Sequence, residues 1–262
     1  MYSSARLNDC LSEFSQVSGL ETNPNKCSTY MSDIDDNLKL HICSLLNFSE
    51  GVLPVRYLGM PLISKRLSYL DCSPLINKVF DQFQSWQKKK TLSYAGRLQL
   101  IKIVILGIQI FWTSNYVLLV KVLEKIDSLC SDFLWNHKIH LLSWVTICQS
   151  KERGGLGVLC AKARNYVAAM KLLWMIHLKK DLSWIKWVHG IYLRQFNIWQ
   201  VQIRVNDSWM WKQLLKVRDM MIDKFSNVIN IQNVINRNCS EGKVQLSSIC
   251  SELIQQNAQL LG

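Results

Sequence analysis

The stretch Ser85–Lys102 reads S-W-Q-K-K-K-T-L-S-Y-A-G-R-L-Q-L-I-K and organises the rest of the chain. It joins a basic run, Lys88-Lys89-Lys90, to a predicted helix start at Ser93, because a serine hydroxyl can accept a backbone N–H of the first helical turn. The helix becomes apolar from Leu98 onward. A basic entry to a buried helix suits a groove for a polyanion, although the same lysines could simply form a solvated turn.

One arginine of this stretch lies inside the predicted helix. At 100° per residue, Arg97 falls beside Ile101, Val104 and Ile108 on an apolar face. A charge on such a face needs a partner, so a paired structural role competes with phosphate binding. The candidate nucleic-acid-binding residues of the chain are Lys88, Lys89, Lys90, Arg97 and Lys102.

Charge is unevenly spread over the 262 residues, whose net charge is +12. Residues 1–50 carry 3 Lys/Arg against 7 Asp/Glu, whereas residues 51–200 carry 21 against 7 and residues 201–262 carry 7 against 5. The basic middle favours nucleic acid or an anionic membrane as a partner. The apolar fraction of 49% indicates a folded protein with an ample core.

The nine cysteines follow no C-x-x-C pattern, which favours reduced thiols and an intracellular protein, in the nucleus or cytoplasm. The polar N-terminus does not resemble a secretory signal. The run Ile103–Val120 is the one membrane candidate, but its polar residues interrupt it, so we expect a buried core helix and no membrane partner. The spacing of Cys130, His137, His140 and Cys148 matches no common zinc site, and no metal site is expected.

The first 64 residues are expected to combine helices with short strands. Apolar residues at 7, 11, 14 and 17 predict a helix over 5–18, and Gly19 can end it. Lys26–Met31 is a predicted short strand after a turn, and Val55–Gly59 is another. The acidic run ending in Asp35-Asp36 precedes a predicted helix that continues to about Leu46. We interpret this pair as a helix cap and not as a metal site, because it lies in a polar run and not between hydrophobic strands.

Further helices are predicted beyond residue 64. Ser73-Pro74 starts one, with the serine as its cap, and another covers about Val120–Trp135. Gly154-Gly155-Leu156-Gly157 fits no phosphate-binding pattern and predicts a tight turn. From Asn165 the chain is helical and rich in tryptophan, which at helical spacing indicates packing more often than base stacking. Residues after about 225 are polar and expected to be loosely held.

Several motifs occur in an order that resembles the reverse transcriptases of plant LINE-type (non-LTR) retrotransposons. Trp86–Lys102 looks like the start of their thumb. The motif S-G-L-x-x-N-x-x-K at Ser18–Lys26 looks like the one that follows the catalytic strands of the palm, and Y-L-G-x-P-L at Tyr57–Leu62 looks like their primer-supporting hairpin. Lys151–Gly157, with the pattern K-x-x-G-G-L-G, continues the resemblance, which covers roughly residues 5–218.

The resemblance implies a fold, a set of domains and a function. The fold is mainly α with a small α+β N-terminal part: a residual palm at 1–64, a helical thumb at 65–150, a helical connection region at 151–225 and a polar tail at 226–262. Tyr57, Leu58 and Gly59 would support the primer terminus, and Lys26 is a possible general acid for the leaving pyrophosphate. No other catalytic residue is expected.

The implied partners are an RNA/DNA template–primer and the missing N-terminal part of a reverse transcriptase. The parent reaction uses Mg²⁺, but the catalytic aspartates would precede residue 1, so this chain alone would hold no cofactor and would not polymerise. The alternative is a helical remnant or protein-interaction module without any nucleic-acid function.

Overall fold

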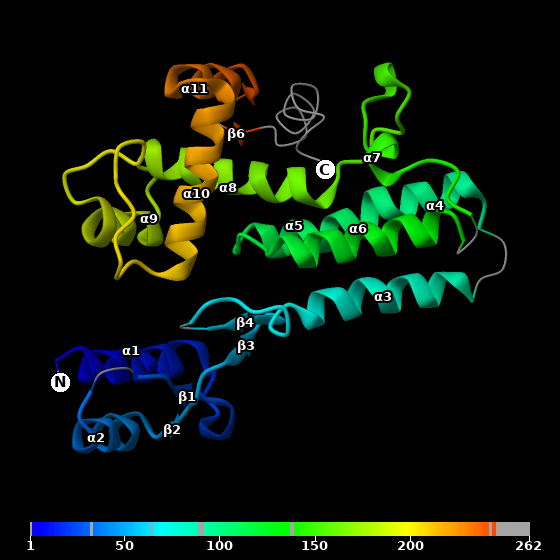
Figure 1. Ribbon diagram of the computed structural model, residues 1–262. Coiled ribbons are helices and arrows are strands. Elements are labelled where there is room, and N and C mark those ends of the chain that lie inside the picture. The colour runs from blue at the N-terminus through cyan, green and yellow to red at the C-terminus, as the bar shows by residue number, and fades with distance from the viewer. Residues whose placement is uncertain are drawn as a thin grey trace. The chain divides into compact units, whose positions relative to one another are not determined.

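The computed structural model describes residues 2–31, 34–63, 65–88, 92–136, 139–240 and 243–244, including the side chains of 5–31, 34–63, 65–88, 92–136 and 139–238. The chain divides into two compact units, unit 1 (Met1–Ser64) and unit 2 (Lys65–Gly262). The fold is mainly α with a small α+β N-terminal part, as predicted (Figure 1). The division of unit 2 into thumb, connection region and tail stays a prediction.

Unit 1 holds two helices, a 3₁₀ turn and four short strands. These are α1 (Tyr2–Ser18), η1 (Pro24–Lys26), β1 (Ser28–Thr29), α2 (Asp36–Leu46), β2 (Ser49–Glu50), β3 (Val55–Tyr57) and β4 (Met60–Leu62). The strand predicted over Lys26–Met31 shrinks to the two residues of β1, which pair in parallel with β2. A pair so short adds little stability, and the unit also contains the packing of α1 on α2 and the hairpin of β3 with β4.

Helix α1 confirms the predicted helix and its end, since Gly19 follows it at a φ of +68°. Its apolar stripe is largely uncovered: Leu7, Phe14 and Val17 are 49%, 57% and 90% exposed. An apolar stripe on an amphipathic helix is normally the side that packs. Unit 1 therefore presents a helix face without a covering element among the described residues.

The hairpin of β3 and β4 is closed by two residues. Tyr57 pairs with Met60, and Leu58 and Gly59 between them have φ values of 52° and 82°. Two successive positive φ angles suit the right-handed twist of a two-residue hairpin. Gly59 therefore ends the predicted strand by forming the turn and does not continue it.

Unit 2 is helical. It contains α3 (Ser73–Gln87), α4 (Tyr94–Leu100), the π-helical η2 (Ile101–Ile105), α5 (Leu106–Thr113), α6 (Val120–Leu134), α7 (Trp144–Ile147), the 3₁₀ turn η3 (Lys151–Arg153), α8 (Ala161–His177), α9 (Ser183–Val188), the π-helical η4 (His189–Leu193), α10 (Trp209–Phe225), α11 (Val228–Arg237) and a hairpin of β5 (Cys239–Ser240) with β6 (Lys243–Val244).

Helix α3 packs on α6, and the two helices lie side by side in Figure 1. The rings of Phe83 and Phe133 stack at 4.4 Å, and Trp86 packs against both. The predicted start of α3 is wrong in one detail. Cys72 is its N-cap and makes no side-chain cap bond, so Ser73 is the first helical residue and Pro74 the second.

The apolar run Ile103–Val120 is not the single buried helix that was expected. It covers the second half of a continuous helix, Tyr94–Thr113, and a linker that leads into α6. Within the described residues this helix is long and apolar enough to cross a membrane, judged by length and composition alone, and only 22% of its apolar window is buried. Ile103, Ile110 and Phe111 are exposed, so one face packs and the other does not.

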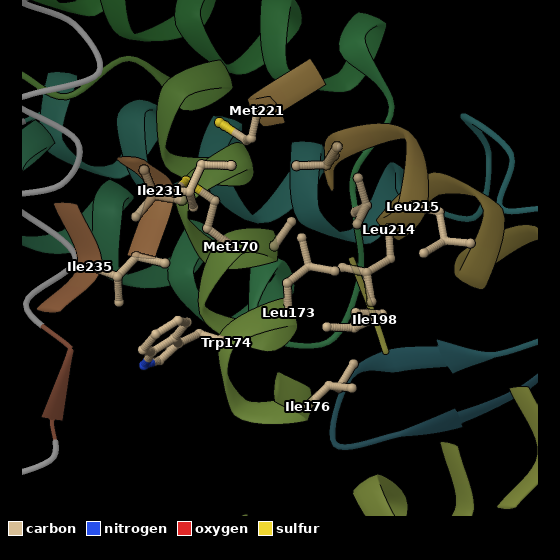
Figure 2. Close-up of a cluster of buried hydrophobic side chains, with 14 of the residues drawn as sticks. Met170, Leu173, Trp174, Ile176, Ile198, Leu214, Leu215, Met221, Ile231 and Ile235 are labelled. Atoms are coloured by element: carbon tan, nitrogen blue, oxygen red, sulfur yellow. The ribbon is translucent and has the colours of Figure 1, made fainter. Parts of the chain in front are cut away.

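Helix α8 is the centre of unit 2. It packs against α5, α6 and α10, and most of its residues are buried, including four alanines that let neighbouring helices approach closely. Figure 2 shows Leu173 of α8 directed toward Leu214 of α10, whereas Met170 and Trp174 lie on the side of Ile231 and Ile235 of α11. A helix that is apolar nearly all round belongs inside a core.

Buried polar side chains of this core donate hydrogen bonds to backbone carbonyls. Gln109 of α5 donates to the Ala161 carbonyl at 2.8 Å. Arg218 of α10 donates to the carbonyls of Ile198 and Val201 at 2.8 and 2.6 Å and pairs with Asp219. Ile198 and Val201 lie in the loop before α10, so Arg218 satisfies loop carbonyls that are away from water, whereas Ala161 is the first residue of α8.

The segment after residue 225 departs from expectation at its beginning. Helix α11 has a strong amphipathic pattern, and its Ile231, Val234 and Ile235 are buried in the core of unit 2. Its polar residues occupy the outer face, which explains why the composition resembled a loose tail. The rest of the predicted tail, apart from β5 and β6, lies outside the described residues.

The cysteines with described side chains are all reduced. Cys10 of unit 1 is exposed, whereas four cysteines of unit 2 are buried, namely Cys72, Cys130, Cys148 and Cys160. Burial raises the pKa of Cys72 to about 12 and that of Cys160 to about 11. These buried thiols are therefore neutral and act as small apolar groups.

Candidate nucleic-acid interface

Of the basic run Lys88-Lys89-Lys90, only Lys88 lies within the described residues. Lys88 is exposed at the C-terminal end of α3, where its N–H donates to the Gln84 carbonyl. A lysine there also complements the negative end of the helix dipole. Lys89 and Lys90 lie outside the described residues, so their role in phosphate binding stays a prediction.

Arg97 is half-buried and joins two elements. Its Nε donates to the Leu134 carbonyl at 3.0 Å, and one terminal nitrogen donates to the Leu92 carbonyl at 3.0 Å. Leu134 is the last residue of α6, and carbonyls at helix ends lack intrahelical partners. Arg97 therefore has the structural role that the sequence left open, and a phosphate would have to compete with two carbonyls for its guanidinium.

Lys102 lies in the π-helical segment η2 and reaches the glycine-rich turn. Its Nζ donates to the Leu156 carbonyl at 2.6 Å. Burial and the nearby charge of Lys151 lower the pKa of Lys102. Lys102 and Lys151 are therefore like charges close to each other at the end of the predicted thumb. A bound anion would reduce the repulsion between them.

The glycine-rich turn that positions Lys151 has the predicted compact geometry. Gly154 and Gly157 have φ values of +80° and +62°. Gly155 is packed so closely that a Cβ there would lie 2.1 Å from the Gln149 carbonyl oxygen. The turn therefore serves to bring η3 back against the α4–α5 helix and not to surround a phosphate.

A second pair of like charges lies on unit 2. Burial and the positive charge of Lys162 lower the pKa of Lys224. Lys162 belongs to the first turn of α8 and Lys224 to the last turn of α10. Lys151, Lys162 and Lys224 were not among the predicted nucleic-acid-binding residues. They are far apart in the sequence, and only the packing of the helices shows which lysines are neighbours.

The candidates of unit 1 occupy exposed positions. Lys26 ends the short 3₁₀ turn η1, whose N-cap Asn23 accepts from the Asn25 N–H at 3.0 Å, and its side chain is exposed. Tyr57 and Leu58 at the hairpin tip are 61% and 70% exposed. A tip with an exposed aromatic ring and an exposed leucine can contact a large partner, but no described contact assigns one.

The described carboxylates Asp35 and Asp36 of unit 1 form a helix cap and an ion pair. Asp35 caps α2 by accepting from the Asn37 N–H at 3.2 Å, as predicted, and Asp36 pairs with Lys39 at 2.9 Å. Asp33 lies outside the described residues. Among the residues with described positions, no group of three or more His, Cys, Asp or Glu side chains is placed to hold a metal ion.

Comparison with known proteins gives one match in a plant. A protein of Arabidopsis thaliana named "Putative ribonuclease H protein" is 33% identical over 130 residues, which are 48% of this chain and 21% of that protein. The chain thus spans about a fifth of the length of this relative. No protein-family model matches the chain.

Proposed function

We propose that this chain is the C-terminal part of a plant LINE-type reverse transcriptase and that it binds an RNA/DNA template–primer through unit 2. The order of motifs from Ser18 to Lys151, the mainly α fold and the similarity to a protein named for ribonuclease H support a retroelement origin. Ribonuclease H acts on RNA/DNA hybrids, which is the nucleic acid proposed here.

The observation that carries the proposal is the grouping of like charges. Lys102 lies near Lys151, and Lys224 lies near Lys162, on a unit whose sequence is strongly basic. Holding lysines close together costs free energy in the isolated protein and is offset when a polyanion binds. Contacts of this kind recognise the phosphate backbone and not the base sequence.

The proposed role is binding without polymerisation by this chain alone. Polymerisation needs carboxylates that hold two Mg²⁺ ions, and the adjacent pair Asp35 and Asp36 is engaged in capping α2 and in pairing with Lys39. A polypeptide that supplies the catalytic aspartates would complete the site, and Lys26 would then serve as the general acid.

Fluorescence anisotropy of a labelled RNA/DNA hybrid tests the proposal. The affinity should fall steeply with salt, and the double substitution Lys102→Gln/Lys151→Gln should reduce the slope of log K against log[salt] by about 1 to 2. Lys186→Gln is the matched control, because Lys186 is already paired with Asp181. Binding that does not change between about 50 and 500 mM salt would contradict the electrostatic mechanism.

Primer extension on an RNA template with Mg²⁺ and deoxynucleotides tests the second half of the proposal. Hybrid binding without extension is the expected result. Extension would mean that carboxylates of this chain hold the metals after all, and Asp33, Asp35 and Asp36 would be the first to replace. Absence of both binding and extension would remove the nucleic-acid function.

A protein-contact role is favoured by one specific observation, the uncovered face of α1. Leu7, Phe14 and Val17 point their apolar groups to solvent, and such a face fits contact with another polypeptide surface. Phe14→Glu should then reduce self-association in sedimentation velocity. Phe80→Glu, at an exposed position of α3, is the control and should leave it unchanged; a monomeric parent chain would count against the contact.

A further inference from the structure

Unit 2 contains a large apolar cavity whose apolar space the proposed function does not use. Its volume is about 800 Å³, and its lining comes mainly from η2, α5, α8, α9, η4 and α10. Pockets of this size, mostly apolar with a few polar groups, are typical of sites for small organic ligands. The cavity lies wholly within unit 2.

The lining accounts for one of the exposed apolar residues of the α4–α5 helix, Ile110. Leu106 and Ile110 of α5 face the cavity, as do Leu172 and Met175 of α8. Trp184 and Trp187 lie one helical turn apart on α9, and both line it while remaining 38% and 56% exposed. Two tryptophans that stay accessible at the edge of an apolar space suggest a contact surface and not core packing.

The charge of the lining has a single sign. Lys102, Lys171 and Arg164 contribute to it, and no described aspartate or glutamate does. Arg164 is buried and donates to the Leu159 carbonyl. Lys171 is exposed at the edge of the cavity, where a ligand with one anionic group would complement it and an uncharged ligand would not. The lining therefore selects an apolar body and a negative end.

Both π-helical segments of the chain contribute to this cavity. Lys102 comes from η2, and Tyr192, whose hydroxyl donates to the Ser208 hydroxyl at 2.9 Å, comes from η4. Single π-helical turns occur frequently at functional sites, because the extra residue shifts the side chains that follow it. Here both irregular turns place a polar or charged side chain at one apolar space.

We propose that this cavity binds a single amphiphilic anion, a molecule with an apolar body of lipid or aromatic type and one carboxylate, sulfonate or phosphate group. The apolar body occupies the space between α5, α8 and α9, with Trp184 and Trp187 against it. The anionic group lies beside Lys171, the exposed cation of the lining. The site requires neither template nor primer, although it shares the lining residue Lys102 with the proposed nucleic-acid interface.

Two fluorescent probes of matched shape test the proposal on the full chain. The probes are 8-anilinonaphthalene-1-sulfonate and N-phenyl-1-naphthylamine, which lacks the sulfonate. Both should bind, and the sulfonate should bind more tightly by about fivefold, the effect expected of partly exposed cations. Lys171→Gln should reduce this preference, whereas Lys216→Gln, at an exposed position of α10 outside the lining, should not.

A pair of substitutions on one helix separates the cavity from general surface adsorption. Ile110→Asp places a negative charge in the lining and should weaken sulfonate binding by about tenfold or more. Ile103→Asp is the control, because Ile103 is 71% exposed on the same helix and does not line the cavity. Equal effects of the two substitutions, or equal affinity of the two probes, would overturn the proposal.

A competition experiment distinguishes a monomeric ligand from a membrane surface as the source of the anion. Decanoate below its micellar concentration should displace the sulfonate probe, which would identify a monomeric ligand. Co-sedimentation with anionic vesicles, without displacement by decanoate, would assign the apolar face to a membrane surface and overturn the proposal.

Discussion

The side chain of Asn165 and the backbone of Leu118 form a reciprocal pair. Asn165 Oδ1 accepts from the Leu118 N–H at 2.9 Å, and its Nδ2 donates to the Leu118 carbonyl at 3.3 Å. Both residues are buried. The amide of α8 thus replaces a strand partner for the extended linker between α5 and α6, which has no sheet to join.

Removal of this amide should destabilise unit 2. Asn165→Ala leaves a buried N–H and a buried carbonyl unpaired, and we expect a loss of about 2 to 4 kcal/mol in the free energy of unfolding, measured by urea denaturation. Asn206→Ala, at an exposed turn position, is the control and should change stability by less than about 0.5 kcal/mol. Equal effects would refute a structural role for the pair.

Asp127 should make the stability of unit 2 depend on pH. Burial raises its pKa from 3.8 to about 6, although its carboxylate accepts from the Ala161 N–H at the start of α8. The protonated form is therefore favoured in the folded state, and stability should fall by roughly 2 to 3 kcal/mol as pH rises from about 4 to 6 and then level off.

The isosteric substitution Asp127→Asn should remove this pH dependence, because asparagine keeps an oxygen for the Ala161 N–H and does not titrate. Urea midpoints measured from pH 4 to 7 would show a flatter profile for the variant. The exposed substitution Asp181→Asn should leave the slope in place. A variant profile parallel to the parent would mean that another group titrates.

Two adjacent glycines should respond differently to alanine. At Gly155 a Cβ would meet the Gln149 backbone, so Gly155→Ala should displace the turn and cost more than about 3 kcal/mol. Gly154 has a positive φ but open space around it, and Gly154→Ala should cost only about 1 kcal/mol. Thermal unfolding of the two variants checks the order, and a reversed order would contradict the packing described for the turn.

The hairpin tip offers a test of backbone strain in unit 1. Leu58 has a φ of 52°, a region that leucine rarely adopts and asparagine tolerates. Leu58→Asn should therefore protect the amides of β3 and β4 by about threefold to tenfold in hydrogen exchange, whereas Gly59→Ala should reduce their protection. Unchanged exchange in both variants would argue that the turn does not limit hairpin opening.

Local sequence signals predicted the secondary structure well where a cap or stop stood beside an apolar pattern. Ser93 accepts from the Gly96 N–H, Asp35 caps α2 and Gly19 ends α1, each as predicted. These signals act over three or four residues, so no tertiary information is needed to use them.

Predictions failed where the outcome depended on distant packing. Trp174 and Trp211 are buried as expected, but Trp184 and Trp187 are exposed at the cavity. The helical pattern of the tryptophans does not distinguish the buried from the exposed ones. Their burial depends on which helix packs against them. Helix α11 was missed for a related reason, since its three buried residues are separated by polar ones in a segment of polar composition.

The candidate site was foreseen in part. Lys102 was named as a candidate because it belongs to the thumb-like motif. Lys151 was quoted only as the first residue of the glycine-rich motif, and the structure shows that the turn formed by this motif contacts Lys102. Arg97 shows the opposite case: a helical wheel indicated an apolar face and a need for partners, but could not indicate that both partners are backbone carbonyls.

The uneven burial of the cysteines makes the protein its own reporter of unfolding. A thiol-reactive maleimide should modify Cys10 at once, whereas Cys72, Cys130, Cys148 and Cys160 become accessible only when unit 2 opens. Mass spectrometry of labelled peptides therefore times the opening of unit 2, with the exposed Cys10 as the internal reference for the labelling rate. The rate at which the four buried thiols acquire label would give the lifetime of the folded helical unit directly.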